Sequence, residues 1–127
     1  MSRILIYDAR GNRADWLQRL EGESQGLVVC GAREAMLNAL AGDRPDALIY
    51  VLGDLPLDLG VLRLVRRIAP ALPIIVLGGP TGLEARRRVQ DLRPVYFGFL
   101  PPDAAELREA VRGALGHESP VRPARAS

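Results

Sequence analysis

Short apolar runs alternate with amphipathic segments along the whole chain, and this alternation predicts its secondary structure. Five runs are almost continuously apolar and rich in β-branched or aromatic residues, as expected of strands buried on both faces. They cover residues 3–8, 27–30, 46–52, 73–77 and 95–100. In the segments between and after them, apolar residues recur every three to four positions, which predicts helices over 12–21, 33–41, 60–69, 82–92 and 103–115.

The same periodicity predicts which side chains of the helices are buried. On the helix over 60–69, the expected inward face is Val61, Leu64, Val65 and Ile68, with Arg63, Arg66 and Arg67 facing solvent. Asp103 is expected to cap the start of the last helix.

Strands that alternate with helices through short loops predict an α/β fold. Five βα units fit an open, doubly wound, five-stranded parallel sheet with helices on both faces, and are too few for an eight-unit barrel. We expect one folded domain over residues 1–116. The remaining segment, 117–127, is polar and Pro-rich and is expected to be a disordered tail or linker.

Composition excludes several classes of function. No apolar run approaches 18 residues and the chain opens without a signal-peptide pattern, so we expect a cytoplasmic protein with no membrane association. A single cysteine, Cys30, is expected to be a small core residue, and with only one histidine no metal or other cofactor is expected.

The basic residues are unusual because all 17 are arginine and the chain contains no lysine. Schiff-base chemistry and a P-loop lysine are therefore excluded. The net charge of +2 and only six aromatic residues argue against direct nucleic-acid binding.

In a doubly wound sheet, ligands bind beyond the carboxyl ends of the strands. The first strand is followed by Asp8-Ala9-Arg10-Gly11-Asn12, which lacks the G-x-G-x-x-G dinucleotide pattern. The third strand runs into Gly53-Asp54-Leu55-Pro56. Asp8 and Asp54 are expected to be turn or capping residues, the alternatives being a weak metal ligand and a displaced phosphoacceptor, respectively.

Four segments, in this order along the chain, carry a resemblance to a known family: ILIYDA, RPDALIYVLGDLPLDLG, LPIIVLGG and VYFGFLPPDAAELREAV. Over residues 3–116 the chain resembles the response-regulator receiver domain of the chemotaxis-Y-like type. The resemblance implies a flavodoxin-like (βα)5 topology. It also implies a phosphorylation site made of an acidic pair, an aspartate nucleophile, a hydroxyl residue and a lysine.

When the family's phosphorylation site is matched to this chain, most of its positions hold residues that cannot take part in phosphorylation. The acidic pair becomes Asp8 and Ala9, and the nucleophile falls on Val51 or Leu52. The hydroxyl becomes Gly78, and the Lys-Pro pair becomes Leu100 and Pro101. We therefore expect a pseudo-receiver without catalytic activity, in which Val51 and Leu100 pack together where receivers carry charged groups.

Such a domain would serve bacterial signal transduction by binding a protein partner or a second copy of itself. The expected surface is the face of the last two predicted helices and the fifth strand, with Arg86, Arg87, Tyr96, Phe97, Phe99, Arg108 and Arg112.

Three alternatives stay open at the level of sequence. One is a sensor for an anion or nucleotide second messenger, bound by the glycine-rich loop of Gly78, Gly79, Thr81 and Gly82 and the arginines that follow it. Another is the N-terminal regulatory domain of a longer transcriptional regulator. The third, an enzyme on the same sheet, is disfavoured because no acid, base and nucleophile converge.

Overall fold

A computed structural model describes residues 3–9, 26–79, 82–100 and 102–116. The strands are β1 (Arg3–Asp8), β2 (Gly26–Cys30), β3 (Ala47–Val51), β4 (Ile74–Gly78) and β5 (Tyr96–Phe99). The helices are α1 (Arg33–Asp43), α2 (Leu55–Ile68), α3 (Gly82–Val89), the short 3-10 helix η2 (Gln90–Leu92) and α4 (Ala104–Leu115). All five predicted strands are confirmed to within one residue at each end. The helix predicted over 12–21 and the tail over 117–127 lie outside the described residues.

The five strands form one parallel sheet in the order β2-β1-β3-β4-β5, which confirms the predicted fold class. β1 lies between β2 and β3. From β1 the chain adds β2 on one side of the sheet and then β3, β4 and β5 on the other, so the strand order reverses between β1 and β3. The register pairs Tyr7 with Tyr50 and Asp8 with Val51. The carboxyl ends of β1 and β3 therefore meet at the switch point, where sheets of this kind bind their ligands.

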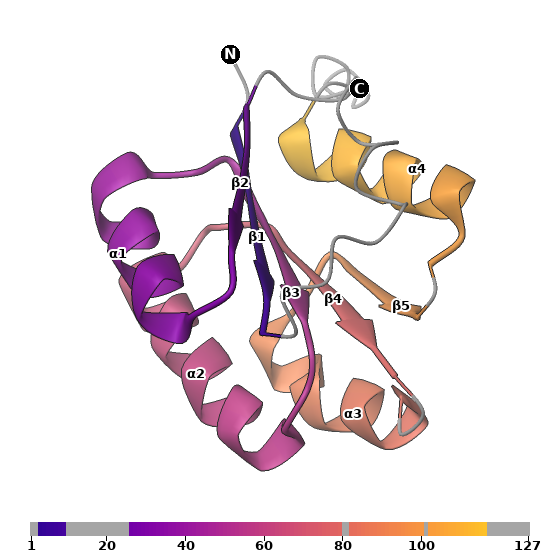
Figure 1. Ribbon diagram of the computed structural model, residues 1–127. Coiled ribbons are helices and arrows are strands. Elements are labelled where there is room, and N and C mark those ends of the chain that lie inside the picture. The colour runs from indigo at the N-terminus through magenta and orange to yellow at the C-terminus, as the bar shows by residue number, and fades with distance from the viewer. Residues whose placement is uncertain (1–2, 10–25, 80–81, 101, 117–127) are drawn as a thin grey trace.

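Each face of the sheet has its own apolar cluster, because successive side chains of a strand point to opposite faces. Leu48 and Tyr50 belong to the cluster beneath α1, α2 and α3, whereas Ile49 and Val51 belong to the cluster beneath α4. Figure 1 shows this division, with α4 on the opposite side of the sheet from the other described helices. None of the described helices is long and apolar enough to span a membrane.

Helix α2 differs from its prediction in its start and in its buried face. It begins at Leu55 because Pro56 suits the first turn of a helix, where its missing N–H costs nothing. The earlier start adds Leu59 to the core face, which also contains Leu62 and Val65. The predicted inward orientation of Leu64 and Ile68 is wrong, since each is 42% exposed. The other two predicted inward residues are placed correctly, since Val65 is buried and Val61 packs against the core.

The end of α2 is fixed by the side chain of Arg66, which was expected in solvent. Its guanidinium donates hydrogen bonds to the carbonyl oxygens of Leu72 at 2.6 Å, of Leu92 at 2.8 and 3.1 Å, and of Pro70 at 3.2 Å. Leu72 lies two residues before β4 and Leu92 is the last residue of η2, four residues before β5. The guanidinium of Arg66 thus links α2 to the segments that lead into β4 and β5.

Candidate functional site

The carboxyl edge of the sheet brings most of the predicted degenerate pocket together. Asp8 is the last residue of β1, within the strand predicted over 3–8, and is only 3% exposed. It pairs in register with Val51, the last residue of β3. The exposed Ala9 follows Asp8. Pro101 lies outside the described residues.

Strand β4 connects this edge to the other predicted pocket residues. The backbone N–H of Leu52 donates to the carbonyl of Leu77 at 2.9 Å, and that of Leu100 donates to Gly78 at 2.8 Å. Val51 is buried in the same apolar cluster as Leu77, and Leu100 packs against that cluster. Both residues thus border the same apolar cluster, and direct packing of Val51 against Leu100 stays a prediction. On the face of the sheet that α4 covers, the side chains around the end of β3 are apolar.

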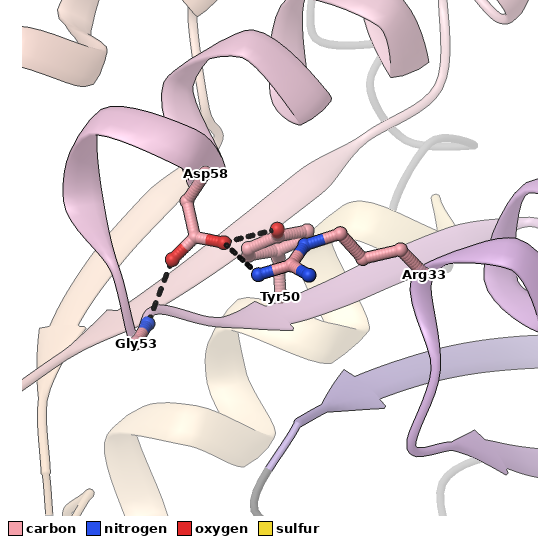
Figure 2. A network of polar contacts seen from close by, with 4 residues as sticks. All are labelled: Arg33, Tyr50, Gly53 and Asp58. Carbon is pink, nitrogen blue, oxygen red and sulfur yellow. Dashed lines mark hydrogen bonds and ion pairs between the residues drawn. The ribbon is translucent and has the colours of Figure 1, made fainter.

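The other face of the same edge holds a polar network that the sequence analysis missed (Figure 2). Its centre is Asp58, in the first turn of α2 and only 1% exposed. Its Oδ1 accepts a hydrogen bond from the Tyr50 hydroxyl at 2.6 Å, and its Oδ2 accepts one from the Gly53 backbone N–H at 2.7 Å. The guanidinium Nη2 of Arg33, at the start of α1, lies 3.9 Å from Oδ1. The carboxylate therefore joins β3, the loop after it, and two helices.

Burial and hydrogen bonding keep Tyr50 a neutral donor in this network. Burial is the main cause that raises the pKa of Tyr50 far above its usual value of 10.0, followed by its hydrogen bond to Asp58. The ring of Tyr7 packs against that of Tyr50, with centroids 4.8 Å apart and planes inclined by 39°. Burial also raises the pKa of Tyr7. Both phenols thus stay protonated at neutral pH.

Both oxygens of Asp58 are occupied by donors from within the chain. These hydrogen bonds hold the loop between β3 and α2 in place. Because their acceptor is charged, they are stronger than hydrogen bonds between neutral groups. A sequence signal for it existed: Asp58 stands at i−4 from Leu62 and i−7 from Val65, on the inward face of α2. Asp54, four residues earlier, is exposed at the N-cap and makes no side-chain capping bond. Among the described residues, no three or more His, Cys, Asp or Glu side chains gather as a metal site would require.

The predicted docking face of α3, β5 and α4 presents a mixed surface. Arg86, Arg87 and Arg112 are exposed, Phe99 is 44% exposed, and Arg108 is half-buried. Phe97 packs against the core, and its ring meets that of Phe99 edge-on at 5.6 Å. The hydroxyl of Tyr96 donates to Glu106 Oε1 at 2.8 Å, which joins β5 to α4.

A groove runs along the side of this docking face between α3 and β5. Its lining includes Arg86, Arg93, Val95 and Tyr96. The glycine-rich loop is only partly described: Gly78 ends β4, Gly79 follows it half-buried, Gly82 begins α3, and Thr81 lies outside the described residues. The anion-binding prediction for this loop stays a prediction.

Comparison with known proteins bears on the fold. No family model matches the chain, and no curated protein matches it. Solved structures do match. The chain aligns with a CheY-like response regulator receiver domain from Methanospirillum hungatei JF-1 at a TM-score of 0.78 and 18% identity, over 94% of this chain and 98% of the other. The chain has the fold of a receiver domain.

Two further structures agree with this fold. A receiver domain from Clostridium thermocellum matches with a TM-score of 0.77 and 16% identity, over 95% of this chain and 99% of the other. A protein from Rhodopirellula baltica described as an adenylate cyclase matches with a TM-score of 0.71 and 16% identity, over 98% and 95% of the two chains. Identities this low establish a shared fold alone.

Proposed function

We propose that the chain is a receiver-like module of bacterial signal transduction that acts by protein binding and does not use phosphorylation. The observation that carries this proposal is the apolar end of β3. There Val51 lies 2% exposed in a hydrocarbon cluster, with Leu100 packed against it. Neither residue can accept or pair with a phosphoryl group.

Several features support the loss of phosphoryl chemistry. The chain has no lysine to neutralise a phosphoryl oxygen, and Gly78 offers no hydroxyl. A pair of adjacent carboxylates, which would hold Mg²⁺, is reduced to Asp8 followed by Ala9. The one other buried carboxylate among the described residues, that of Asp58, is engaged by Tyr50 and Gly53 on the opposite face of the sheet. The module would therefore have no catalytic activity of its own.

Intact-mass spectrometry after incubation with acetyl phosphate and Mg²⁺ tests this part of the proposal. We expect no mass gain under conditions in which an active receiver in the same tube gains one phosphoryl group. A stoichiometric gain refutes the proposal. Repeating the reaction with Asp54→Asn and Asp8→Asn variants then identifies the acceptor.

For the binding surface, we propose the face of α3, β5 and α4, which would dock a protein partner or a second copy. It combines exposed arginines with the half-exposed ring of Phe99, and arginine and aromatic residues are enriched at interface centres. Helices α3 and α4 carry five arginines and three glutamates, so the face has a small excess of positive charge, which would suit a partner with an acidic surface.

An affinity capture from bacterial lysate tests this surface, with the wild type beside an Arg87→Glu/Arg112→Glu variant. A matched control, Arg44→Glu/Arg63→Glu, changes the net charge equally at exposed positions on other elements. We expect a partner that the wild type and the control retain and the first variant loses. Equal capture by all three proteins would move the interface to another face.

A further inference from the structure

Strand β5 forms an edge of the sheet, and part of its backbone faces away from β4. Of the described strands, β4 alone pairs with β5, which lies between α3 and α4 in Figure 1. The N–H of Leu100, the residue after Phe99, donates to the carbonyl of Gly78 in β4 at 2.8 Å. Since backbone groups two residues apart in a strand point the same way, those of Gly98 also face β4, and those of Phe97 and Phe99 face the free edge. These two residues can therefore hydrogen-bond to a further strand.

The sequence of β5 lacks the features that commonly protect a free edge. Proteins guard such edges with charged side chains, prolines or bulges. Strand β5 is Tyr-Phe-Gly-Phe, without a charge or a proline. The ring of Phe99 is 44% exposed. An edge of this composition favours pairing with another chain.

On the α3 side of this edge lies a positively charged groove of about 420 Å³. Its lining includes Phe97, Gln90 and the exposed Arg86 and Arg93. The described residues that line it include no acid. The guanidinium of Arg66, whose Nη2 lies 3.4 Å from the carbonyl oxygen of Arg93, adds a third positive charge nearby. This side of the edge therefore favours acidic side chains.

On the α4 side of the same edge lies a second groove, which is mostly apolar. Its lining includes Tyr96, Ala105 and Ala110. The acids that line it are Glu106 and Glu109, which would repel an acidic side chain. The hydroxyl of Tyr96 is already hydrogen-bonded to Glu106 at 2.8 Å. This side of the edge therefore favours apolar side chains.

We infer that β5 binds an extended segment of a partner protein, in which acidic residues alternate with apolar ones, as an additional strand of the sheet. Successive side chains of a strand point to opposite faces, so an added strand would place every second residue in each groove. The acidic residues would face Arg86 and Arg93, and the apolar residues would face Ala105 and Ala110. In strand addition, main-chain hydrogen bonds supply affinity and the flanking pockets supply specificity. The inference rests on the proposed docking face of α3, β5 and α4, and names the kind of segment that this face binds.

Charge argues against a second copy of the chain as the occupant. Two β5 strands paired edge to edge about a two-fold axis would form one continuous sheet with the same faces aligned. The two arginine-lined grooves would then share a face, with no acid among the described residues that line either. An acidic segment of a different protein avoids this repulsion.

A synthetic peptide of about eight residues, a usual strand length, tests the inference. In this peptide glutamate alternates with valine, and we expect it to bind with a dissociation constant below about 1 mM. Amide hydrogen exchange measured by NMR then identifies the backbone groups involved. At saturation, exchange at Phe97 and Phe99 should slow at least fivefold, and exchange at Gly98, already bonded to β4, should change less.

Three altered peptides separate strand addition from attraction between charges. A peptide of the same composition, with its glutamates in one block and its valines in another, should bind at least tenfold more weakly. Methylation of backbone nitrogens removes donors, either on the glutamates or on the valines. Only one of these two methylated peptides should lose binding, because only alternate N–H groups of a strand face its neighbour. Loss with the glutamates methylated would indicate antiparallel pairing, and loss with the valines methylated would indicate parallel pairing.

A pair of protein variants tests the arginine groove. Arg86→Glu/Arg93→Glu should weaken binding of the alternating peptide at least tenfold, and should bind a lysine–valine peptide better than the wild type does. The control Arg44→Glu/Arg63→Glu makes the same change in net charge at exposed positions and should weaken binding less than threefold. Each pair contains one arginine with a positive φ, 54° for Arg93 and 51° for Arg44, so the backbone is perturbed alike.

Four results would overturn the inference: no binding at about 1 mM, equal binding of the alternating and block peptides, equal effects of the two methylated peptides, or unchanged exchange at Phe97 and Phe99. The lysate capture separates such a failure from failure of the proposed function. A partner that Arg87→Glu/Arg112→Glu loses, in a protein that binds no peptide, would preserve the docking face and overturn strand addition alone.

Discussion

Removal of the Asp58 carboxylate should destabilise the protein more than removal of any exposed acid. Asp58→Ala takes away the acceptor for the Tyr50 hydroxyl, which has no exposed surface, and for the Gly53 N–H. It also leaves Arg33 without the carboxylate that its guanidinium faces. The substitution therefore orphans donors on three elements at once.

The structure allows the cost to be apportioned. A buried donor left without a partner costs about 1–3 kcal/mol, and the Tyr50 hydroxyl belongs to a residue with no exposed surface. Gly53 is exposed and the Arg33 side chain is 36% exposed, so water can replace most of what these two lose. We expect a loss of about 3 kcal/mol in the free energy of unfolding, or about 12 °C in the melting temperature of a domain this size. Tyr50→Phe, which removes one hydrogen bond but keeps the carboxylate paired with Gly53 and Arg33, should cost about 1.5 kcal/mol.

Urea unfolding followed by far-UV circular dichroism measures both variants, provided that the slope of free energy against urea stays unchanged. Asp54→Ala is the control, since it makes the same change four residues earlier at an exposed N-cap without a side-chain capping bond, and should cost less than about 1 kcal/mol. The reasoning is refuted if Asp58→Ala costs no more than Asp54→Ala. A loss for Tyr50→Phe as large as that for Asp58→Ala would also contradict it, because the tyrosine would then carry the whole effect.

Three further predictions concern the rest of the described fold. Gly98→Ala should lower the free energy of unfolding in urea by about 1–3 kcal/mol, because its Cβ would lie 2.8 Å from Cε2 and 3.1 Å from the hydroxyl of Tyr96. Gly60→Ala, whose Cβ would have nothing within 4 Å, should raise it by about 0.5–1 kcal/mol by stabilising α2. Arg66→Ala should cost about 2 kcal/mol by loss of its carbonyl contacts, against less than about 0.5 kcal/mol for the exposed Arg63→Ala. Tyrosinate absorbance should be much lower at pH 11 in the native protein than in urea, because burial and Glu106 raise the pKa of Tyr96 to about 12 and the other two tyrosine pKa values are also raised.

The tyrosine prediction has a definite sign for stability. A pKa raised in the folded state stabilises the protein fully below pH 10, where tyrosine in the unfolded chain is still protonated, and this contribution is lost as pH rises through 10 to about 12. Stability that is constant between pH 9 and pH 12 would contradict the assignment. Equal effects of the two glycine substitutions, or of the two arginine substitutions, would contradict the other two predictions.

The fold was accessible from the sequence because its strands are nearly continuous apolar runs. Residues 47–51 and 74–78 are buried without exception, and such runs predict central parallel strands with little ambiguity. The predicted cap at Asp103 is confirmed, since its side chain accepts a hydrogen bond from the Glu106 N–H. Buried strands and helix caps depend on residues that are close together in the sequence, so the sequence alone predicts them.

Helix faces and buried polar contacts were harder to predict. Helix α2 has apolar residues on two sides, so its periodicity allowed two inward faces, and only its start at Leu55 decides between them. Asp58 reads as a surface residue by type, and its burial depends on Tyr50 and Arg33, eight and twenty-five residues away. A partner so distant in sequence becomes visible only once the strands and helices are placed.

The Asp58 contacts also bear on how a cell would control such a protein. The loop after β3 is held by groups that the chain itself encodes, a phenol, a carboxylate and a guanidinium, rather than by a bound ligand. Under the proposed function, the shape of this loop would not depend on a kinase or a phosphatase. The signalling activity of the protein would then depend on its concentration in the cell, which transcription and proteolysis control. A substitution that lowers the free energy of unfolding would therefore act by lowering that concentration.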